Sequence, residues 1–203
     1  LYRFSPMQTS FGCNMLALNG GRPEQLTLRD FLSHFITFRE EVVARRTAFE
    51  LRKARERSHV LCGLAVAVSN VDEVVKTIRS SADAADAREK LMTRRWPAHE
   101  IAPFIRLIDD PSHTLNDDGT YNLSEIQARA ILDLRLQRLT QLGVKEVTDE
   151  LEELAAKIKD YLEILGSRDR IMEIISGELS EIKAMFAVPR RTEIADWAGD
   201  LEA

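Results

Sequence analysis

LRDFLSHFITFREEVVARRTAFELRKARERSHVLCGLAVAVS (residues 28–69) is one uninterrupted stretch around which the fold is built. In its first half the apolar residues alternate at spacings of three and four, which keeps them on one face of a helix. They are Leu28, Phe31, Phe35, Phe38, Val42 and Phe49. Because the stretch has no proline and its first glycine is Gly63, it predicts a single helix roughly 60 Å long that Thr27 caps.

The same helix changes character along its length. Between residues 45 and 57 the apolar face narrows to Ala48, Phe49, Leu51 and Ala54, which is wide enough for only one packing partner. Residues 60–68 (VLCGLAVAV) carry no charge on any side, so this part should be buried all round. The pattern therefore predicts a stalk, residues 28–69, that enters a globular knob.

Composition limits the classes of protein that need to be considered. The chain has 203 residues and a net charge of -5, which argues against a general coat for nucleic acid. No run of 18 apolar residues exists, so we expect no membrane span and a cytoplasmic protein. Cys13 and Cys62 fit neither disulfide nor zinc spacing, and we expect both to be buried, reduced thiols. The chain lacks an initiator Met and a signal peptide, as expected of an internal fragment.

Residues 1–27 are the only part with strand character. Phe11, Cys13 and Met15 alternate in residues 10–18, and Asn19-Gly20-Gly21 supplies a tight turn before a return near residues 25–28. A lone hairpin is marginal in water, so we expect its sheet partners to precede Leu1 in a longer protein.

The predicted knob covers residues 70–146 and contains short helices, a loop at 109–122 and a helix at 125–139. Ser124 and Gln127 form a capping box at the start of that last helix. One of its apolar rows is Ile126, Ala130 and Leu134, and the other is Leu132, Leu136 and Leu139. Two rows fit either a central core helix or a helix that meets another subunit, and periodicity alone does not decide between them.

The chain returns along a second long helical segment, residues 147–188. Its apolar residues alternate by four and three, as in a coiled-coil seam. Gly166 breaks the pattern and Ser167 recaps it, which makes this pair a candidate hinge. Since outgoing and returning segments have similar lengths, we expect an antiparallel hairpin whose facing residue numbers add to about 215. That register places Arg52 near Glu163.

The predicted fold class is therefore mainly α. It consists of a long antiparallel two-helix coiled coil with a small helical globular knob at its tip, a short N-terminal β-hairpin remnant and a tail at residues 189–203.

No catalytic or metal site emerges from residue spacing. The tyrosines Tyr2, Tyr121 and Tyr161 lack neighbouring basic clusters. The loop ending at Glu125 imitates an EF-hand, but Thr114 replaces its first acidic ligand. The histidines have no ligand spacing.

A basic run at residues 45–57 has six Arg or Lys side chains against two Glu. Such a run is either a solvated, ion-paired helix face or a surface that neutralises DNA phosphates. The candidate DNA-facing residues are Arg46, Lys53 and Arg57.

Four motifs closely resemble the A subunits of bacterial type IIA topoisomerases, DNA gyrase more than topoisomerase IV. They are TSFGCNMLAL (9–18), RRTAFELRKARERSHVLCGL (45–64), SEIQARAILDLRLQRLTQL (124–142) and LGSRDRIMEII (165–175). The resemblance implies the end of a tower domain (residues 1–27), two coiled-coil arms and an exit gate formed by the knob.

In that family two A subunits meet at the knob, and a transported duplex leaves when the knobs part. The resemblance thus favours a homodimer through the helix at 125–139. The candidate interface residues are Ile126, Ala130, Ile131, Leu132, Leu134, Leu136 and Leu139.

The resemblance also implies what the fragment should lack. The nucleophilic tyrosine lies upstream, while ATP and magnesium belong to a B subunit, so we expect no cofactor and no DNA cleavage here. The implied partners are a second copy, the B subunit and double-stranded DNA. The rival interpretations are a chromosome-organising tether with antiparallel arms and a plain coiled-coil adaptor.

Overall fold

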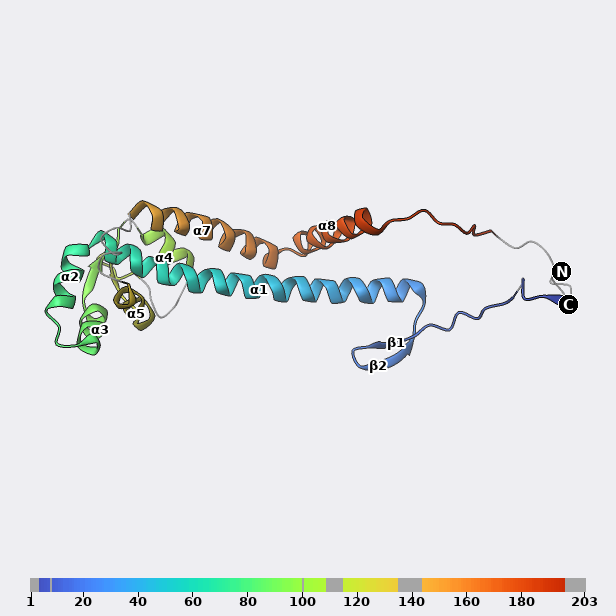
Figure 1. Ribbon diagram of the computed structural model, residues 1–203, viewed down its shortest axis with the longest axis horizontal. Helices are drawn as coiled ribbons and strands as arrows, with labels where there is room; N and C mark the ends of the chain where they lie inside the picture. Colours follow the sequence, from blue (N-terminus) through green and yellow to red (C-terminus); the bar gives the residue numbers. More distant parts are fainter. Residues whose placement is uncertain (1–3, 8, 100, 109–114, 135–143, 196–203) are drawn as a thin grey trace. The chain divides into compact units, whose positions relative to one another are not determined.

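The computed structural model describes residues 4–7, 9–99, 101–108, 115–134 and 144–195 (Figure 1). Its helices are α1 (Leu28–Ser69), α2 (Val71–Arg79), α3 (Ala84–Thr93), α4 (Ala102–Ile108), α5 (Glu125–Asp133), α7 (Val144–Gly166) and α8 (Arg168–Phe186). Its strands are β1 (Leu16–Asn19), β2 (Arg22–Gln25), β3 (Arg95–Pro97) and β4 (Thr120–Asn122). The mainly helical fold with a long helix and an N-terminal hairpin is confirmed.

The chain divides into two compact units. One unit combines Leu1–Val43 with Asp169–Ala203, and the other is Ala44–Arg168. Helix α1 contributes residues to both.

The first unit contains the hairpin, in which β1 and β2 pair antiparallel from Leu16 opposite Gln25 to Asn19 opposite Arg22. Gly20 and Gly21 have φ values of 57° and 81°, as a two-residue type I′ turn requires. The first predicted strand, residues 10–18, was too long at its start. The predicted return near residues 25–28 came too late in the chain, because only the two glycines of the turn separate the strands. Strand β1 begins at Leu16, and the return strand is Arg22–Gln25.

The start of α1 is capped as predicted. The Thr27 hydroxyl accepts a hydrogen bond from the Asp30 amide at 3.3 Å, and the Thr27 amide donates to the Asp30 carboxylate at 2.9 Å. Hydrogen bonds from the Thr27 side chain, and then from its amide, hold the pKa of Asp30 below its usual value.

The apolar stripe of α1 in the first unit is largely exposed. Phe35 and Phe38 are 45% and 56% exposed, and Leu28 and Leu32 are more so. On α8 a set of apolar side chains is exposed as well: Leu179, Ile182, Met185 and Phe186. An ion pair between Arg39 and Glu178 links the two helices.

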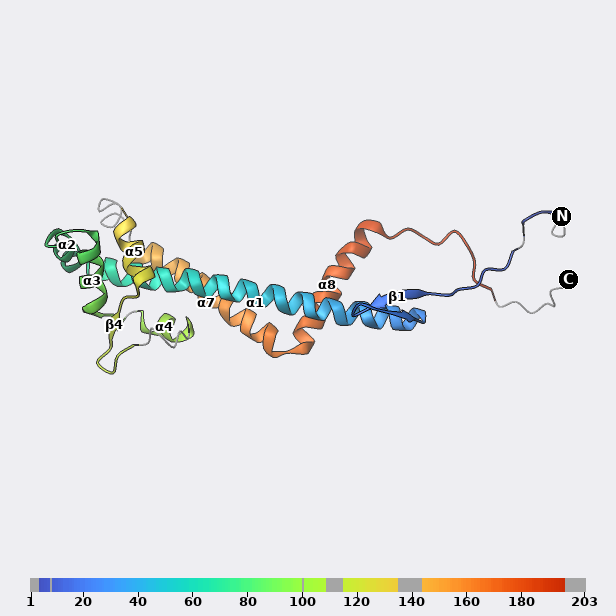
Figure 2. The same cartoon turned by 90° about the horizontal axis from the view of Figure 1, so that it is seen from below.

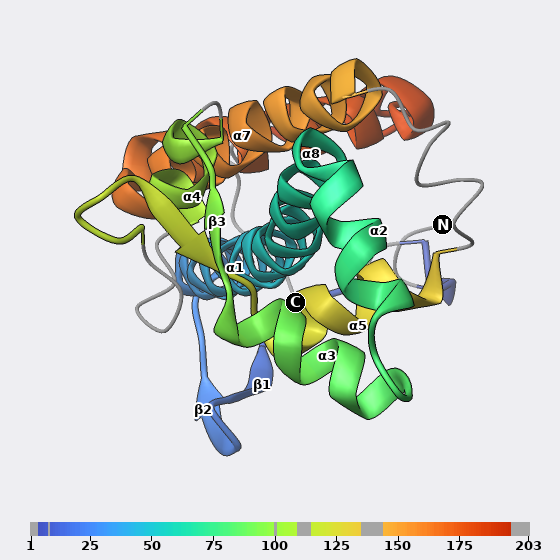
Figure 3. The same cartoon turned by 90° about the vertical axis from the view of Figure 1, so that its left-hand side faces the viewer.

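The second unit has a hydrophobic core around the C-terminal end of α1, where α2, α3 and α5 gather (Figure 2, Figure 3). Within the apolar run, Leu61, Cys62, Ala65, Val66 and Ala67 are each at most 2% exposed, so the prediction of burial is confirmed for these residues. We call this core and the elements that build it the knob. Its other fully or nearly buried members are Val74, Leu91, Trp96, Ala98, Ile101, Ile105, Tyr121, Leu123, Ala128, Ile131, Val147 and Leu151.

A small sheet that the sequence did not predict lies in the knob. Strand β3 pairs antiparallel with β4, and Trp96 stands opposite Tyr121. Both side chains are 1% exposed. The Trp96 indole donates to the Leu91 carbonyl at 2.9 Å, and the Arg94 guanidinium lies 4.8 Å from the centre of the Trp96 ring. This sheet joins two segments that are far apart in the sequence.

Helix α7 runs antiparallel to the α1 residues of this unit. Leu51 and Ala54 share a small apolar cluster with Ile158, and Leu154 and Tyr161 pack against it. Burial raises the pKa of Tyr161, with smaller contributions from the charges of Glu50 and Asp160.

The predicted register of this hairpin is wrong by about two helical turns at its knob end. Arg57 donates two hydrogen bonds to Glu150, at 2.8 and 3.2 Å, where the predicted register places Ile158. Arg52 pairs with Glu56 on its own helix. Equal helix lengths do not determine a register, because the first residues of α7 also pack into the knob core.

Two predicted helix boundaries can be compared with the structure. The break at Gly166 is confirmed, since α7 ends there, α8 begins at Arg168, and the Ser167 amide donates to the Ile164 carbonyl at 3.3 Å. The helix predicted for 125–139 ends earlier, at Asp133, because Leu134 has an extended conformation with ψ of 130°. Residues 135–143, with Leu136 and Leu139, lie outside the described residues.

In the described part of the chain no single helix is long and apolar enough to cross a membrane. The pair α1 and α2, bent by 91°, passes that test by length and composition alone.

The two cysteines differ, which corrects the expectation that both are buried. Cys13 is exposed, because it precedes the hairpin and no described element covers it, whereas Cys62 is buried. We expect one thiol of the native chain to react quickly with an aromatic disulfide reagent and the second only after denaturation. Fast reaction of both thiols in the native state would contradict the burial of Cys62.

Burial also raises the pKa of the Cys62 thiol from 9.0 to about 12. Between these pH values the folded state keeps a proton on Cys62 that the unfolded state releases. The contribution of this proton to the free energy of unfolding should therefore be fully present below pH 9 and fall by about 1.4 kcal/mol per pH unit above it. Urea unfolding from about pH 8 to about pH 10.5 measures this slope. A Cys62→Ala variant should lose the Cys62 contribution, and an unchanged slope in that variant would assign the effect to other groups.

Candidate functional site

The candidate site is the outer surface of α5, which a capping box starts. The Ser124 hydroxyl accepts from the Gln127 amide at 3.1 Å, and the Gln127 side chain accepts from the Ser124 amide at 2.9 Å. This confirms the predicted cap. Because both capping residues are buried, at 4% and 0% exposed, the cap also orients the helix on the knob.

The predicted interface residues fall on different sides of α5. Ile126 is 63% exposed and Ala130, one turn later, is half-buried. Ile131 is 1% exposed and belongs to the core, while Leu132 and Leu134 are half-buried and pack against it. The described residues therefore bring Ile126 and Ala130 together on the outside and turn Ile131 inward.

Charged side chains flank the exposed Ile126 on one side. Glu125 pairs with Arg129 at 2.9 Å and with Arg88 of α3 at 3.3 Å. Such exposed pairs contribute little to stability, but they give the apolar surface a polar rim.

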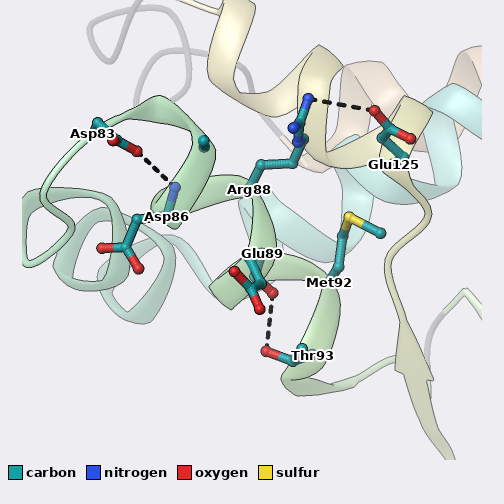
Figure 4. Close-up of a pocket in the computed structure, with 8 residues that line it drawn as sticks. Asp83, Asp86, Arg88, Glu89, Met92, Thr93 and Glu125 are labelled. Atoms are coloured by element: carbon teal, nitrogen blue, oxygen red, sulfur yellow. Dashed lines mark hydrogen bonds and ion pairs between the residues drawn. The ribbon is translucent and has the colours of Figure 1, made fainter.

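Beside this rim lies a cavity of about 540 Å³ between α3 and the start of α5 (Figure 4). Its carboxylates are Asp83, Asp86, Glu89 and Glu125. Asp83 already caps α3 by accepting from the Asp86 amide at 2.8 Å. Hydrogen bonds from Lys90 and then from the Ala82 amide lower the pKa of Asp86.

No set of three or more His, Cys, Asp or Glu side chains within the described ranges is arranged to hold a metal ion. In the EF-hand-like loop the Asp118 side chain is engaged within the loop itself, because it accepts a hydrogen bond from the Thr120 amide at 3.0 Å. The first place of that pattern, Thr114, lies outside the described residues.

The basic run is partly compensated by acidic residues of the same chain. Arg57 is held by Glu150, and Lys53 lies 2.9 Å from Glu56. Arg46 is exposed. The guanidinium of Arg52 and the ammonium of Lys53 lie 5.4 and 5.9 Å from the centre of the exposed Phe49 ring. The ion pairs of Lys53 and Arg57 fit a solvated, ion-paired helix face, whereas the exposure of Arg46 fits a surface that meets DNA phosphates.

The two tyrosines among the described residues, Tyr121 and Tyr161, have packing roles. The Tyr121 hydroxyl accepts from Gln127 at 3.0 Å inside the knob, and Tyr161 packs against the apolar cluster of Leu51, Ala54 and Ile158. Tyr2 lies outside the described residues.

Comparisons with known proteins agree with the resemblance of the four sequence motifs to gyrase and topoisomerase IV A subunits. The family model for the A subunit of DNA gyrase and topoisomerase IV matches residues 1–180. The gyrase A subunit of Granulibacter bethesdensis is 52% identical over 200 residues, covering 98% of this chain and 21% of the relative. The gyrase A subunit of Haemophilus influenzae is 45% identical over 209 residues, covering 100% of this chain and 24% of the relative. The chain thus spans about a fifth of the length of the curated relatives it matches.

Proposed function

The chain belongs to the family of DNA gyrase and topoisomerase IV A subunits, and on this premise we propose that it forms the coiled-coil arms and reversible exit gate of a DNA gyrase. Residues 28–69 and 147–188 are the arms, and residues 70–146 are the gate. Residues 1–27 end a tower domain, and residues 189–203 form a tail. The whole enzyme would introduce negative supercoils by passing one duplex through another.

The observation that carries this proposal is the family match, together with the exposure of Ile126 on a helix whose other side is built into the core. A single exposed aliphatic side chain is common on protein surfaces, and Leu18 and Phe186 are more exposed than Ile126, so it is the family match that favours the surface around Ile126 as the one that meets a partner. A second copy of the chain is the proposed partner, because a gate must close with the same surface on both subunits.

The proposed interface keeps the full set of residues derived from the sequence. The structure supports Ile126 and Ala130 as direct contacts, while the buried Ile131 would act from behind by shaping the helix. The remaining members are Leu132, Leu134, Leu136 and Leu139.

In this proposal the fragment opens and closes the gate and contributes no catalytic residue to DNA cleavage. The cleaving tyrosine would belong to a preceding part of the longer subunit, and ATP and magnesium would belong to the B subunit. The partners would be another copy of the longer subunit, the B subunit and double-stranded DNA. The fragment alone should not cleave DNA.

Arg46, Lys53 and Arg57 would face the transported duplex. The ion pairs of Lys53 and Arg57 leave this face only weakly positive, which suits a duplex that must move on rather than stay bound.

Light scattering across a dilution series tests the gate, with Ile126→Asp as the decisive variant. We expect the wild-type chain to reach twice 23.1 kDa and the variant to remain at 23.1 kDa. Two carboxylates buried at a two-fold interface should weaken association about 100-fold or more. Ile182→Asp, at a 50% exposed isoleucine of α8, is the matched control and should still dimerise.

A wild-type chain that stays monomeric at all concentrations would contradict the gate in this fragment and favour the tether or adaptor. Equal loss of the dimer in both variants would place the interface elsewhere.

The second proposed mechanical element is the hinge at Gly166 and Ser167. No atom lies within 4 Å of a Cβ built on Gly166, so alanine fits there without a clash. Alanine favours helix over glycine by about 1 kcal/mol, so Gly166→Ala should lower the population of bent arms about fivefold. Supercoiling by the full-length variant with its B subunit should slow accordingly.

Gly177→Ala, at an equally open glycine inside α8, is the control for this experiment. Wild-type supercoiling and decatenation rates in Gly166→Ala would rule out a hinge at this position.

A further inference from the structure

A polar cluster of three buried residues and the half-buried His59 joins α5 to α1 directly behind the proposed gate surface. Its members are His59, Tyr121, Ser124 and Gln127. The Gln127 side-chain amide donates to the His59 carbonyl at 2.6 Å and to the Tyr121 hydroxyl at 3.0 Å. The His59 ring and the Ser124 hydroxyl share a hydrogen bond of 2.8 Å.

The cluster uses the hydrogen-bonding capacity of Gln127 almost completely. Both amide hydrogens have an acceptor, and its oxygen accepts from the Ser124 amide at 2.9 Å. Since Gln127 is 0% exposed, its polar atoms are shielded from water in this orientation, and a rotation of α5 would break bonds that the protein itself supplies. An apolar contact would tolerate such movement, but this set of bonds allows one orientation.

Gly63 makes the close approach possible. A Cβ built on Gly63 would lie 2.6 Å from both Cβ and Cγ of Gln127. In an α-helix the Gly63 amide is also the intrahelical partner of the His59 carbonyl, so Gln127 binds a carbonyl of the helix ladder itself. The attachment point is therefore backbone of the long helix, not a flexible side chain.

Ile126 and Gln127 are neighbours on α5 with opposite surroundings, 63% and 0% exposed. Whatever holds Gln127 therefore sets the direction in which Ile126 projects. A helix of 9 residues has little stability of its own, so its formation and its orientation depend on such anchors.

We propose that His59, Tyr121 and Gln127 are positioning residues for the gate, which hold α5 on α1 so that its apolar surface meets a second copy in one geometry. This inference rests on the proposed function. It adds a dependence of dimer affinity on a polar cluster that the partner does not touch.

The test compares Gln127→Leu and Tyr121→Phe with Ile105→Val, a control in α4 of the same core. Each chain is examined by thermal unfolding, by hydrogen exchange of α5 and α3, and by the dimer dissociation constant from sedimentation equilibrium. Tyr121→Phe removes only one hydroxyl, so it should fold if Gln127→Leu does not.

We expect faster exchange in α5 than in α3 for both cluster variants, and a dissociation constant raised about tenfold for Gln127→Leu. Ile105→Val should change neither quantity beyond its effect on unfolding. If all three variants weaken the dimer in proportion to lost thermal stability, or if α5 exchange is unchanged, the positioning role is overturned.

Failure of the gate itself gives a different result. If the wild-type chain is monomeric, the proposed function fails, while the exchange of α5 still decides whether the cluster positions this helix.

Discussion

Replacement of Ile131 by Asp should unfold the knob. Ile131 is 1% exposed and lies in the core with Ala128 and Leu123. An aspartate there would bury a charge without a partner and remove an aliphatic side chain, which together cost at least about 4 kcal/mol. Urea unfolding followed by circular dichroism should show a midpoint near zero denaturant or a chain already unfolded.

Two matched variants make this result specific. Ile131→Val should cost only about 0.5–1.5 kcal/mol, because it removes one methylene group. At a concentration low enough for the wild type to be monomeric as well, Ile126→Asp should unfold like the wild type, because Ile126 is exposed and dimerisation then adds nothing to the stability of either chain. If Ile131→Asp remained as stable as Ile126→Asp, the orientation of α5 on the knob would be wrong.

Replacement of Trp96 by Ala should be the second large perturbation. Trp96 is among the largest fully buried side chains of the described residues, and its indole holds the Leu91 carbonyl at the end of α3. The lost burial and the resulting cavity should cost about 3–5 kcal/mol. The same unfolding measurement applies, with the chain at one fixed concentration so that dimerisation does not vary.

Trp96→Phe separates the two contributions of the indole. Phenylalanine keeps most of the apolar volume but cannot donate to the Leu91 carbonyl, so it should cost clearly less than alanine. Equal losses for both variants would assign the whole effect to the hydrogen bond, and no loss for alanine would contradict the burial of Trp96.

These variants separate folding from assembly on one short helix. Substitutions on the inner side of α5 should act on unfolding, and those on the outer side should act on association. A single stability assay would miss the second class, because an exposed isoleucine contributes little to the fold of one chain.

Local sequence patterns predicted those features that depend on neighbouring residues. The Ser124–Gln127 capping box, the Asn19-Gly20-Gly21 turn and the Thr27 cap need only residues within a few positions of one another, and all are present. The break at Gly166 is local in the same sense.

Features that depend on distant residues were missed or misplaced. The pairing of Trp96 with Tyr121 could not be derived, because three-residue strands carry no periodic signal and their partners are far apart. The coiled-coil register was wrong at the knob end, where Arg57 pairs with Glu150, because a repeated apolar pattern fits its partner helix at several offsets.

Periodicity, absence of charge and long motifs are properties of the chain alone, so they were enough to establish the helical class, the long helix and the family. They predicted the burial of residues 60–68 only in part, since Val60, Leu64 and Val68 are half-buried. Three further features emerged only from the packing of the folded chain: which side of α5 faces the core, the pairing of Glu150 with Arg57, and the anchoring of Gln127 on the His59 carbonyl beside Gly63. The difference arises because an apolar pattern specifies how much surface must be buried, whereas packing determines which other surface of the chain covers it.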